Sequence, residues 1–181
     1  MTAIVERATG RLIKTISAPD DVVKLNTPAN CYATDDPPDN GMMHLGGEWV
    51  YIPPSPGTGF AFDYVSRMWI DTRTIDDVRA ARWSIIKMQR EQLEFGGFEY
   101  KGNIYDSDQV SQGRIMGAAI AGLDQTWTLA NNTTVSLTGD ELKELYAALQ
   151  AYIADLHERG RIARFNIDAA TTPQDIEAVT L

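Results

Sequence analysis

The hydrophobic pattern of the chain changes period once, near residue 72. Before that point short apolar runs are separated by glycine, proline, asparagine and aspartate, which is typical of β-strands joined by turns. After it, apolar residues recur every three or four positions, the spacing of amphipathic helices. We therefore predict an α+β protein with two domains. Residues 1–72 form a β-rich domain, and residues 73–181 form a mainly helical domain with two β-hairpins.

The first part of the β-rich domain reads as three short strands, over residues 3–8, 12–17 and 22–25. Residues 35–41 combine two prolines with an Asn-Gly pair, so they predict an exposed loop.

Two similar units follow this loop, and we interpret them as an internal repeat. Each runs from an apolar strand through a turn into a strand that carries a tryptophan, and residues 53–59, rich in proline and glycine, connect the two. Two small hairpins bury little surface by themselves, so their aromatic side chains need a neighbour in the domain or in another chain. The candidate interaction residues of this domain are Trp49, Tyr51, Tyr64 and Trp69.

The helical domain opens with a capping sequence at Thr74 and a helix that we expect to run to about Glu94, before Gly96 and Gly97. This helix carries two apolar stripes on different sides. One consists of Val78, Ala81, Ile85 and Met88, and the other of Trp83, Ile86 and Leu93. A surface helix needs only one apolar face, so we add Trp83, Ile86 and Leu93 to the candidate interaction surface. The alternative is that both stripes pack within one chain.

The remaining pattern predicts hairpin, helix, hairpin, long helix and short helix. Residues 108–123 contain many small and apolar residues and are expected to form the buried helix of the domain. A second capping sequence at Thr138 begins the longest helix, whose pattern can continue beyond Gly160 to Ile167. Pro173 lies at the favoured first position of the last helix.

Composition narrows the function classes. The formal net charge is −9, and the acidic excess is spread along the chain without a basic cluster, which argues against nucleic-acid binding. No apolar run is long enough to insert in a membrane, and the first residues lack a secretion signal, so we expect synthesis in a host cytoplasm. A single cysteine excludes an internal disulfide.

No set of residues predicts a reaction, a cofactor or a metal. Asp106 and Asp108 fit a turn and a helix cap better than a metal pair, and the acidic loop lacks the spacing of a calcium hand. His44, His157 and Cys31 have no partner at a spacing that indicates catalysis. We therefore assign no catalytic, cofactor-binding or metal-binding residue. Carbohydrate binding by the exposed aromatic residues stays open as an alternative.

Several motifs of the helical domain occur together in an order that resembles a known family. They are Gly96-Gly97, Gly102, Ile104-Tyr105-Asp106-Ser107-Asp108, Ser111, Ile115-Met116-Gly117-Ala118, Trp127-Thr128-Leu129-Ala130-Asn131-Asn132, Val135, Leu137-Thr138 and Ile167-Asp168-Ala169-Ala170. The run resembles an uncharacterised domain family of tailed bacteriophages, usually found at the C-terminal end of tail-fibre or baseplate proteins, over about residues 75–179. The hairpins before it are similar to those of tail-fibre proteins and tail-fibre assembly proteins.

The resemblance implies a structural, non-enzymatic protein of the virion tail that docks onto other tail proteins and takes part in host attachment, with a host-surface glycan as a further candidate partner. We expect a homo-oligomer, with a trimer favoured and the residues 74–94 helix at its axis. Two alternatives stay open. One is a tail-fibre assembly chaperone absent from the mature virion, and the other is a carbohydrate-binding adsorption module.

Overall fold

The computed structural model describes all 181 residues, and the chain folds as two compact units. The N-terminal unit is Met1–Arg73 and the C-terminal unit is Thr74–Leu181, so the boundary lies one residue after the predicted one. The α+β class is confirmed, with small antiparallel sheets in both units and four of the five helices in the second. None of the helices is both long enough and apolar enough to cross a membrane.

A three-stranded antiparallel sheet forms the centre of the N-terminal unit. Its strands are β1 (Thr2–Glu6), β2 (Leu12–Ile16) and β3 (Cys31–Asp35), and β1 lies between the other two. Ile4 of β1 packs with Cys31 and with Val23, which belongs to the short helix α1 (Asp20–Leu25).

Two sequence predictions were wrong in this region. Residues 22–25 form the end of α1 and not a strand, because Pro19 and the acidic first turn, Asp20 and Asp21, favour a helix start over the β-preference of two valines. Strand β3 was not predicted, since its register comes from pairing with β1 and not from a pattern of its own.

Two separate two-stranded hairpins complete the N-terminal unit, and they share one construction. They consist of β4 (Met42–Leu45) with β5 (Glu48–Tyr51), and of β6 (Phe60–Asp63) with β7 (Met68–Asp71). In each, the tryptophan indole donates to the carbonyl of a preceding segment, from Trp49 to Asp35 at 3.1 Å and from Trp69 to Pro53 at 2.9 Å. In each hairpin, the residue after the second strand donates its backbone N–H to the carbonyl oxygen of the glycine before the first strand, at 2.8 Å. These shared bonds confirm the internal repeat.

The C-terminal unit has the predicted order of elements. They are α2 (Ile75–Phe95), β8 (Phe98–Tyr100), β9 (Asn103–Tyr105), α3 (Gln109–Ala121), β10 (Gln125–Thr128), β11 (Thr134–Leu137), α4 (Gly139–Ala169) and α5 (Pro173–Ala178). Both predicted capping boxes are present, at Thr74 and at Thr138. Helix α4 runs without a break through Gly160, so the long-helix pattern is confirmed to its far end.

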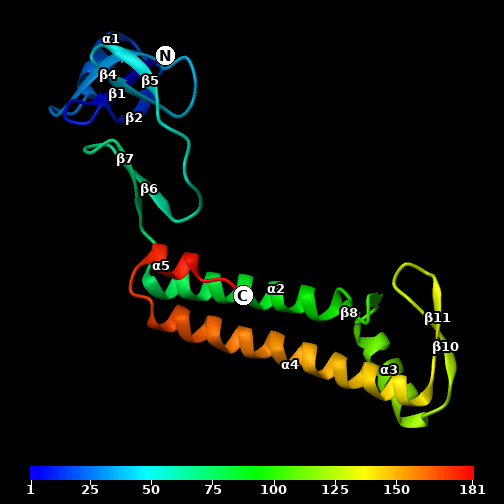
Figure 1. The fold of residues 1–181 in the computed structure, drawn as a ribbon. Helices are drawn as coiled ribbons and strands as arrows, with labels where there is room; N and C mark the ends of the chain where they lie inside the picture. The colour runs from blue at the N-terminus through cyan, green and yellow to red at the C-terminus, as the bar shows by residue number, and fades with distance from the viewer. The chain divides into compact units, whose positions relative to one another are not determined.

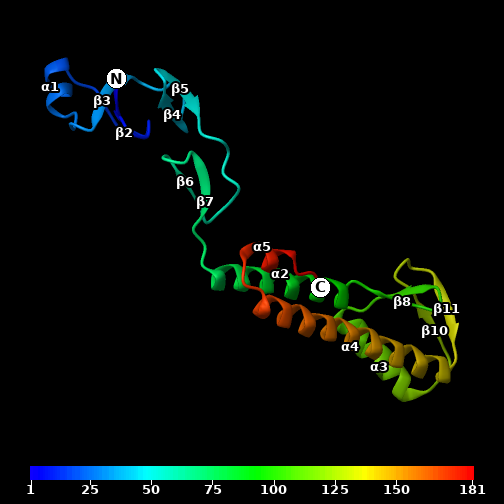
Figure 2. The same ribbon diagram turned by 60° about the vertical axis from the view of Figure 1, so that its left-hand side comes forward.

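Two hydrophobic cores share helix α4. Its N-terminal half packs with α3 and the two hairpins through residues that include Leu142, Leu145 and Leu149, and its C-terminal half packs with α2 and α5 through Ala163 and Ile167. Figures 1 and 2 show α2 and α4 side by side, with α5 folded back onto α2. Each fully buried leucine or isoleucine contributes roughly 1.5–3 kcal/mol to folding.

Two arginines of α2 tie the ends of the other helices to it. Arg79 donates to the carbonyls of Asp168 and Ala170, at 3.3 and 2.9 Å, where α4 ends. Arg82 donates to the carbonyl of Val179, which follows α5. Cationic side chains stabilise the unpaired carbonyls at helix C-termini, so these contacts fix both helix ends against α2.

Helix α3 differs from its prediction. Only Ser111, Ile115 and Ala119 are buried, and the opposite side faces solvent. The small residues that suggested burial allow close contact, but they do not create it. Gly113 and Gly117 have nothing of the chain within 4 Å of the position where a Cβ would stand.

Candidate interaction surfaces

Several of the residues considered for chemistry have structural partners. Asp108 caps α3, accepting from the backbone N–H groups of Val110 and Ser111 and from the Ser111 hydroxyl at 2.5 Å. The hydrogen bonds from Ser111 lower the pKa of Asp108. Nowhere in the chain do three or more histidine, cysteine, aspartate or glutamate side chains gather in a way that could hold a metal ion.

The two histidines and the cysteine are also engaged. His44 is buried, bonded through Nδ1 to the Tyr32 hydroxyl at 2.6 Å, and stacked edge-on against Trp49. His157 lies 3.2 Å from the Glu94 carboxylate. Cys31 is buried in the core of the N-terminal unit.

The four aromatic candidates of the N-terminal unit differ in exposure. Trp49, Tyr64 and Trp69 are partly buried, and both indole N–H groups bond to backbone carbonyls within the unit. Tyr51 is exposed, and its hydroxyl donates to Asp39 at 3.1 Å, a bond that raises the pKa of Tyr51. Fewer of these aromatic rings are therefore exposed to a partner than the sequence suggested.

The second hairpin exposes aliphatic residues instead. One face of β6–β7 carries Phe62 and Trp69, whose rings pack at 5.4 Å between centroids. The other face carries Met68 and Ile70, which are exposed, as is Val65 in the turn. A two-stranded hairpin with apolar side chains on both faces is only marginally stable alone. The sequence already indicates this arrangement, because residues 68–70 are all apolar and successive strand residues point to opposite faces.

The structure buries residues from both predicted stripes of α2 and leaves others of each stripe exposed. Ile86, assigned to the interaction surface, is fully buried in the core with Val78, and Trp83 is half-buried beneath the Arg164 guanidinium. Leu93 is partly exposed, beside a groove that also contains Leu181. The prediction was wrong for Ile86 because helical periodicity separates two stripes without showing which one α4 covers.

The solvent-facing side of α2 carries a second regular row of residues. We call it the α2 seam, and it consists of Ala81, Ile85, Met88, Gln92 and Phe95, all exposed. Ile85, Met88 and Phe95 retain 39%, 61% and 44% of their accessible surface. None of the five was among the candidate interaction residues, although Ala81, Ile85 and Met88 belonged to one of the two predicted stripes.

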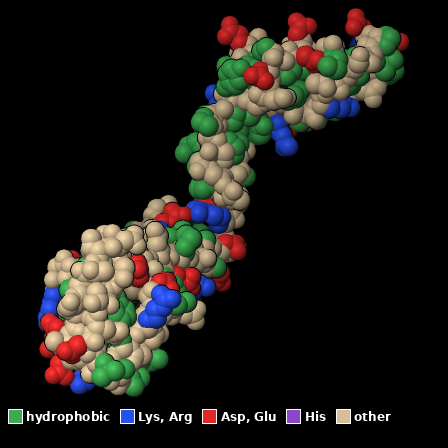
Figure 3. All heavy atoms as spheres, turned by 90° about the vertical axis from the view of Figure 1, so that its right-hand side faces the viewer, with side chains coloured by type: hydrophobic (Ala, Val, Ile, Leu, Met, Phe, Trp, Pro, Cys, Tyr) green, Lys and Arg blue, Asp and Glu red, His purple; other side chains and the backbone are tan.

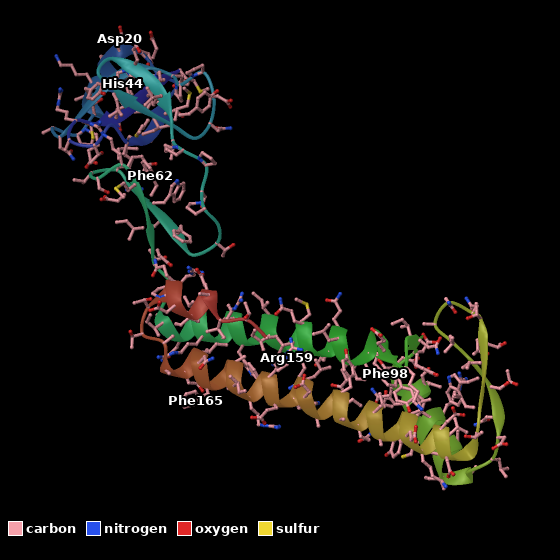
Figure 4. The ribbon with its side chains drawn as sticks, in the orientation of Figure 1. Asp20, His44, Phe62, Phe98, Arg159 and Phe165 are labelled. Atoms are coloured by element: carbon pink, nitrogen blue, oxygen red, sulfur yellow. The ribbon has the colours of Figure 1, made fainter.

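Large apolar side chains are exposed on helix α3 and just after its end. We call Met116 and Ile120 of α3, together with Leu123 just after the C-cap Gly122, the α3 stripe, and Ile120 and Leu123 are 78% and 70% exposed. Next to it an open groove of about 650 Å³ lies between α3 and β10, with Gly117, Ala118, Ala121 and Trp127 among its lining. Phe165 projects from the other end of α4, far along that helix from Phe98 in the core (Figure 4).

Charge does not mark a basic binding face on the side of the molecule displayed in Figure 3. On the face displayed in Figure 3, lysine and arginine side chains stand singly among acidic ones, without a continuous basic patch. Most of the ion pairs join exposed residues close together in sequence, and Lys101 with Glu144, at 2.8 Å, is an exception that crosses from the β8–β9 turn to α4. This pairing lowers the pKa of Glu144 and raises that of Lys101.

A model of a protein family described as a domain of unknown function, DUF4376, matches residues 77–180. The match covers more than half of the chain. The chain belongs to the DUF4376 family. No curated protein and no solved structure matches it.

The DUF4376 domain coincides with almost the whole C-terminal unit, starting within the first turn of α2. It therefore contains the α2 seam, the α3 stripe and the groove beside β10. The repeated hairpins β4–β5 and β6–β7 lie outside the DUF4376 domain.

Proposed function

We propose that this protein is a structural, non-enzymatic component of a bacteriophage tail, in a tail fibre or baseplate, and that it works by docking onto other tail proteins. The tail assignment is supported by the motif resemblance of the C-terminal unit, from the Gly96-Gly97 pair to Ile167-Asp168-Ala169-Ala170. Host attachment is a further part of the proposal.

The α3 stripe is the observation that supports docking best. Isolated soluble domains rarely leave neighbouring large apolar side chains in water, and such groups mark interaction sites. Ile120 on α3 and Leu123 just after its end keep most of their surface in water, although Ile115 and Ala119 of α3 are buried. The bare glycine surface of Gly113 and Gly117 beside them lets a partner backbone approach closely.

The exposed aliphatic face of β6–β7 supports a second docking site in the N-terminal unit. Met68 and Ile70 stand on a hairpin with no third strand to share its hydrogen bonds. A protein with docking surfaces in both of its units can link two neighbours in an assembly.

Quantitative mass spectrometry of purified virions tests the tail assignment. The phage that encodes the chain is grown and purified, and the chain's peptides are compared in amount with those of the capsid and tail proteins. We expect a fixed copy number per particle that stays with the tail fraction after disassembly. Abundant peptides in the lysate with none in the virion would refute the proposal and leave an assembly chaperone as the function.

Ile120→Glu in the phage genome tests the docking surface. Because Ile120 is exposed, the variant should fold and keep its helical circular dichroism, yet its incorporation into particles should fall at least tenfold. Gln150→Glu is the matched control, since it adds the same charge to an exposed position of α4 outside α3. Equal incorporation of both variants would contradict a docking role for the α3 stripe.

A further inference from the structure

The loop before strand β4 contains the single Asn-Gly pair of the chain, Asn40-Gly41. Both residues are exposed, and a Cβ added to Gly41 would have nothing within 4 Å. The side-chain amide of an asparagine lies within reach of the backbone nitrogen of the next residue, and attack by this nitrogen closes a five-membered ring. Glycine in the next position leaves that nitrogen unobstructed, because it has no Cβ. The pair therefore places an electrophile and a nucleophile side by side in an open segment.

Neither of the two reacting groups is hydrogen-bonded within the chain. The side-chain amide of Asn40 has no partner, and the backbone N–H of Gly41 donates to no acceptor. The bonds on either side leave them free, since the Asn40 N–H donates to the Asp39 carboxylate at 2.7 Å and the Gly41 carbonyl accepts from the Ile52 N–H at 2.8 Å. The attack therefore breaks no hydrogen bond at either reacting atom.

The exposed asparagines of the β10–β11 turn differ at this point. The N–H that follows Asn132 belongs to Thr133 and donates to the side chain of Asn131 at 3.0 Å. The N–H that follows Asn131 belongs to Asn132 and donates to the Leu129 carbonyl at 2.9 Å. Each following residue also carries a side chain, which hinders the nitrogen. The turn therefore supplies an internal comparison within the same chain.

We propose that Asn40 is a site of spontaneous deamidation, which converts it to a mixture of aspartate and isoaspartate. The Gly41 nitrogen bonds to Cγ of Asn40, the bond from Cγ to Nδ2 breaks, and ammonia leaves with the proton of the Gly41 N–H. Water then opens the resulting succinimide ring by breaking one of its two C–N bonds. Breakage at Cγ gives aspartate with the original backbone, and breakage at the main-chain carbonyl carbon gives isoaspartate, whose backbone runs through the side chain. Water is the only co-reactant, and no electron is transferred.

The products change the loop where it joins the β4–β5 hairpin. Each adds one negative charge at neutral pH beside Asp39, whose carboxylate already accepts from the Tyr51 hydroxyl at 3.1 Å. Isoaspartate also lengthens the main chain by one methylene immediately before Gly41, whose carbonyl bonds to the Ile52 N–H after strand β5. The modification therefore alters both charge and spacing on an exposed part of the N-terminal unit as the protein ages. It goes beyond the proposed tail function and does not depend on it.

Peptide mapping by mass spectrometry of the full chain tests the proposal. Freshly purified protein is incubated at physiological temperature and mildly alkaline pH in water enriched in heavy oxygen, so that hydrolysis during the incubation labels the product. We expect labelling at Asn40 to be at least tenfold faster than at Asn131 or Asn132, with isoaspartate detected there by enzymatic methylation. Equal rates at the three positions, or no label at Asn40, would overturn the proposal.

Two variants test the chemistry. Asn40→Gln keeps an exposed amide but must close a six-membered ring, so the label at this position should fall at least tenfold. Gly41→Ala should slow the reaction by a similar factor, because the added Cβ hinders the attacking nitrogen. Alanine is strained at the φ of 73°, but its methyl group meets no other atom, so this variant should still fold. Unchanged labelling in either variant would contradict the mechanism.

The same incubation in guanidinium chloride tests the role of the structure. Because neither reacting group is bonded in the folded chain, Asn40 should react at a rate within tenfold of that in the denatured chain. A folded chain that reacts more than tenfold slower would overturn the proposal, since the fold would then protect the site. None of these results bears on the copy number of the protein in virions, so the deamidation site and the tail assignment can fail independently.

Discussion

The junction between α3 and α4 gives the sharpest test of the packing. Gly139 is the first residue of α4, and a Cβ built on it would lie 2.1 Å from the carbonyl oxygen of Gly122, which ends α3. The backbones of the two helices therefore touch directly at this point, and the Gly139 N–H also donates to Asp124 at 2.9 Å. Only glycine fits without displacing a backbone.

The expected cost of Gly139→Ala follows from two opposing effects. Alanine is favoured over glycine in helices by about 1 kcal/mol, which acts in favour of the variant. Overpacking costs roughly 1–3 kcal/mol, at the upper end here because the obstacle is backbone and not a flexible side chain. We expect a net loss of about 1–2 kcal/mol in the free energy of unfolding of the C-terminal unit. That loss corresponds to a fall of roughly 5–10 °C in its Tm.

Gly113→Ala is the matched control for this substitution. It is also a glycine in a helix of the same unit, but nothing lies within 4 Å of its added methyl group. We expect it to raise the free energy of unfolding by up to about 1 kcal/mol. Far-ultraviolet circular dichroism at low protein concentration follows both variants, because four of the five helices belong to this unit. If Gly139→Ala is neutral or stabilising, the close approach of α3 and α4 is wrong.

Two further predictions concern the caps and the core of the C-terminal unit. Glu141 accepts hydrogen bonds from the backbone N–H and the hydroxyl of Thr138, and these bonds lower the pKa of Glu141. The contribution of Glu141 to stability is therefore present above the usual carboxyl range, near pH 4, and is lost as the pH falls through the lowered pKa. The Tm of Glu141→Gln should therefore fall less between pH 5 and pH 3 than that of the natural chain, because glutamine keeps the capping bond without titrating, and an equal fall would refute this assignment. Ile176 lies in the core of α2, α4 and α5, so Ile176→Ala should lower the free energy of unfolding, measured by chemical denaturation, by about 2–5 kcal/mol. The control Ile162→Ala, on the exposed side of α4, should change it by no more than about 0.5 kcal/mol. Similar losses for the two variants would contradict the packing of α5.

Local signals predicted most of the elements but few of their partners. The capping boxes at Thr74 and Thr138 located both long helices, because a cap depends on residues three positions apart. Strand β3 was missed because its register comes from pairing with β1. Helix α1 was missed because the two valines were interpreted as a strand, although Pro19 and the acidic first turn favour a helix start.

The interaction surface was also predicted only as far as local signals allow. Periodicity identified two stripes on α2, and only the fold shows that α4 covers Ile86 and leaves Ile85 and Met88 exposed. The small residues of α3 were interpreted as a sign of burial, yet Gly117 lines an open groove. Both errors arise because apolar residues in a sequence predict burial but do not show which element or which chain buries them.

The 31-residue helix α4 has a mechanical consequence. It is about 45 Å long and belongs to both hydrophobic cores of its unit, so the two cores are joined by an unbroken column of backbone hydrogen bonds. A load applied near the β10–β11 end passes along this column to the contacts of Arg79 with the Asp168 and Ala170 carbonyls at the other end of α4. The unit is therefore suited to transmit force along its length.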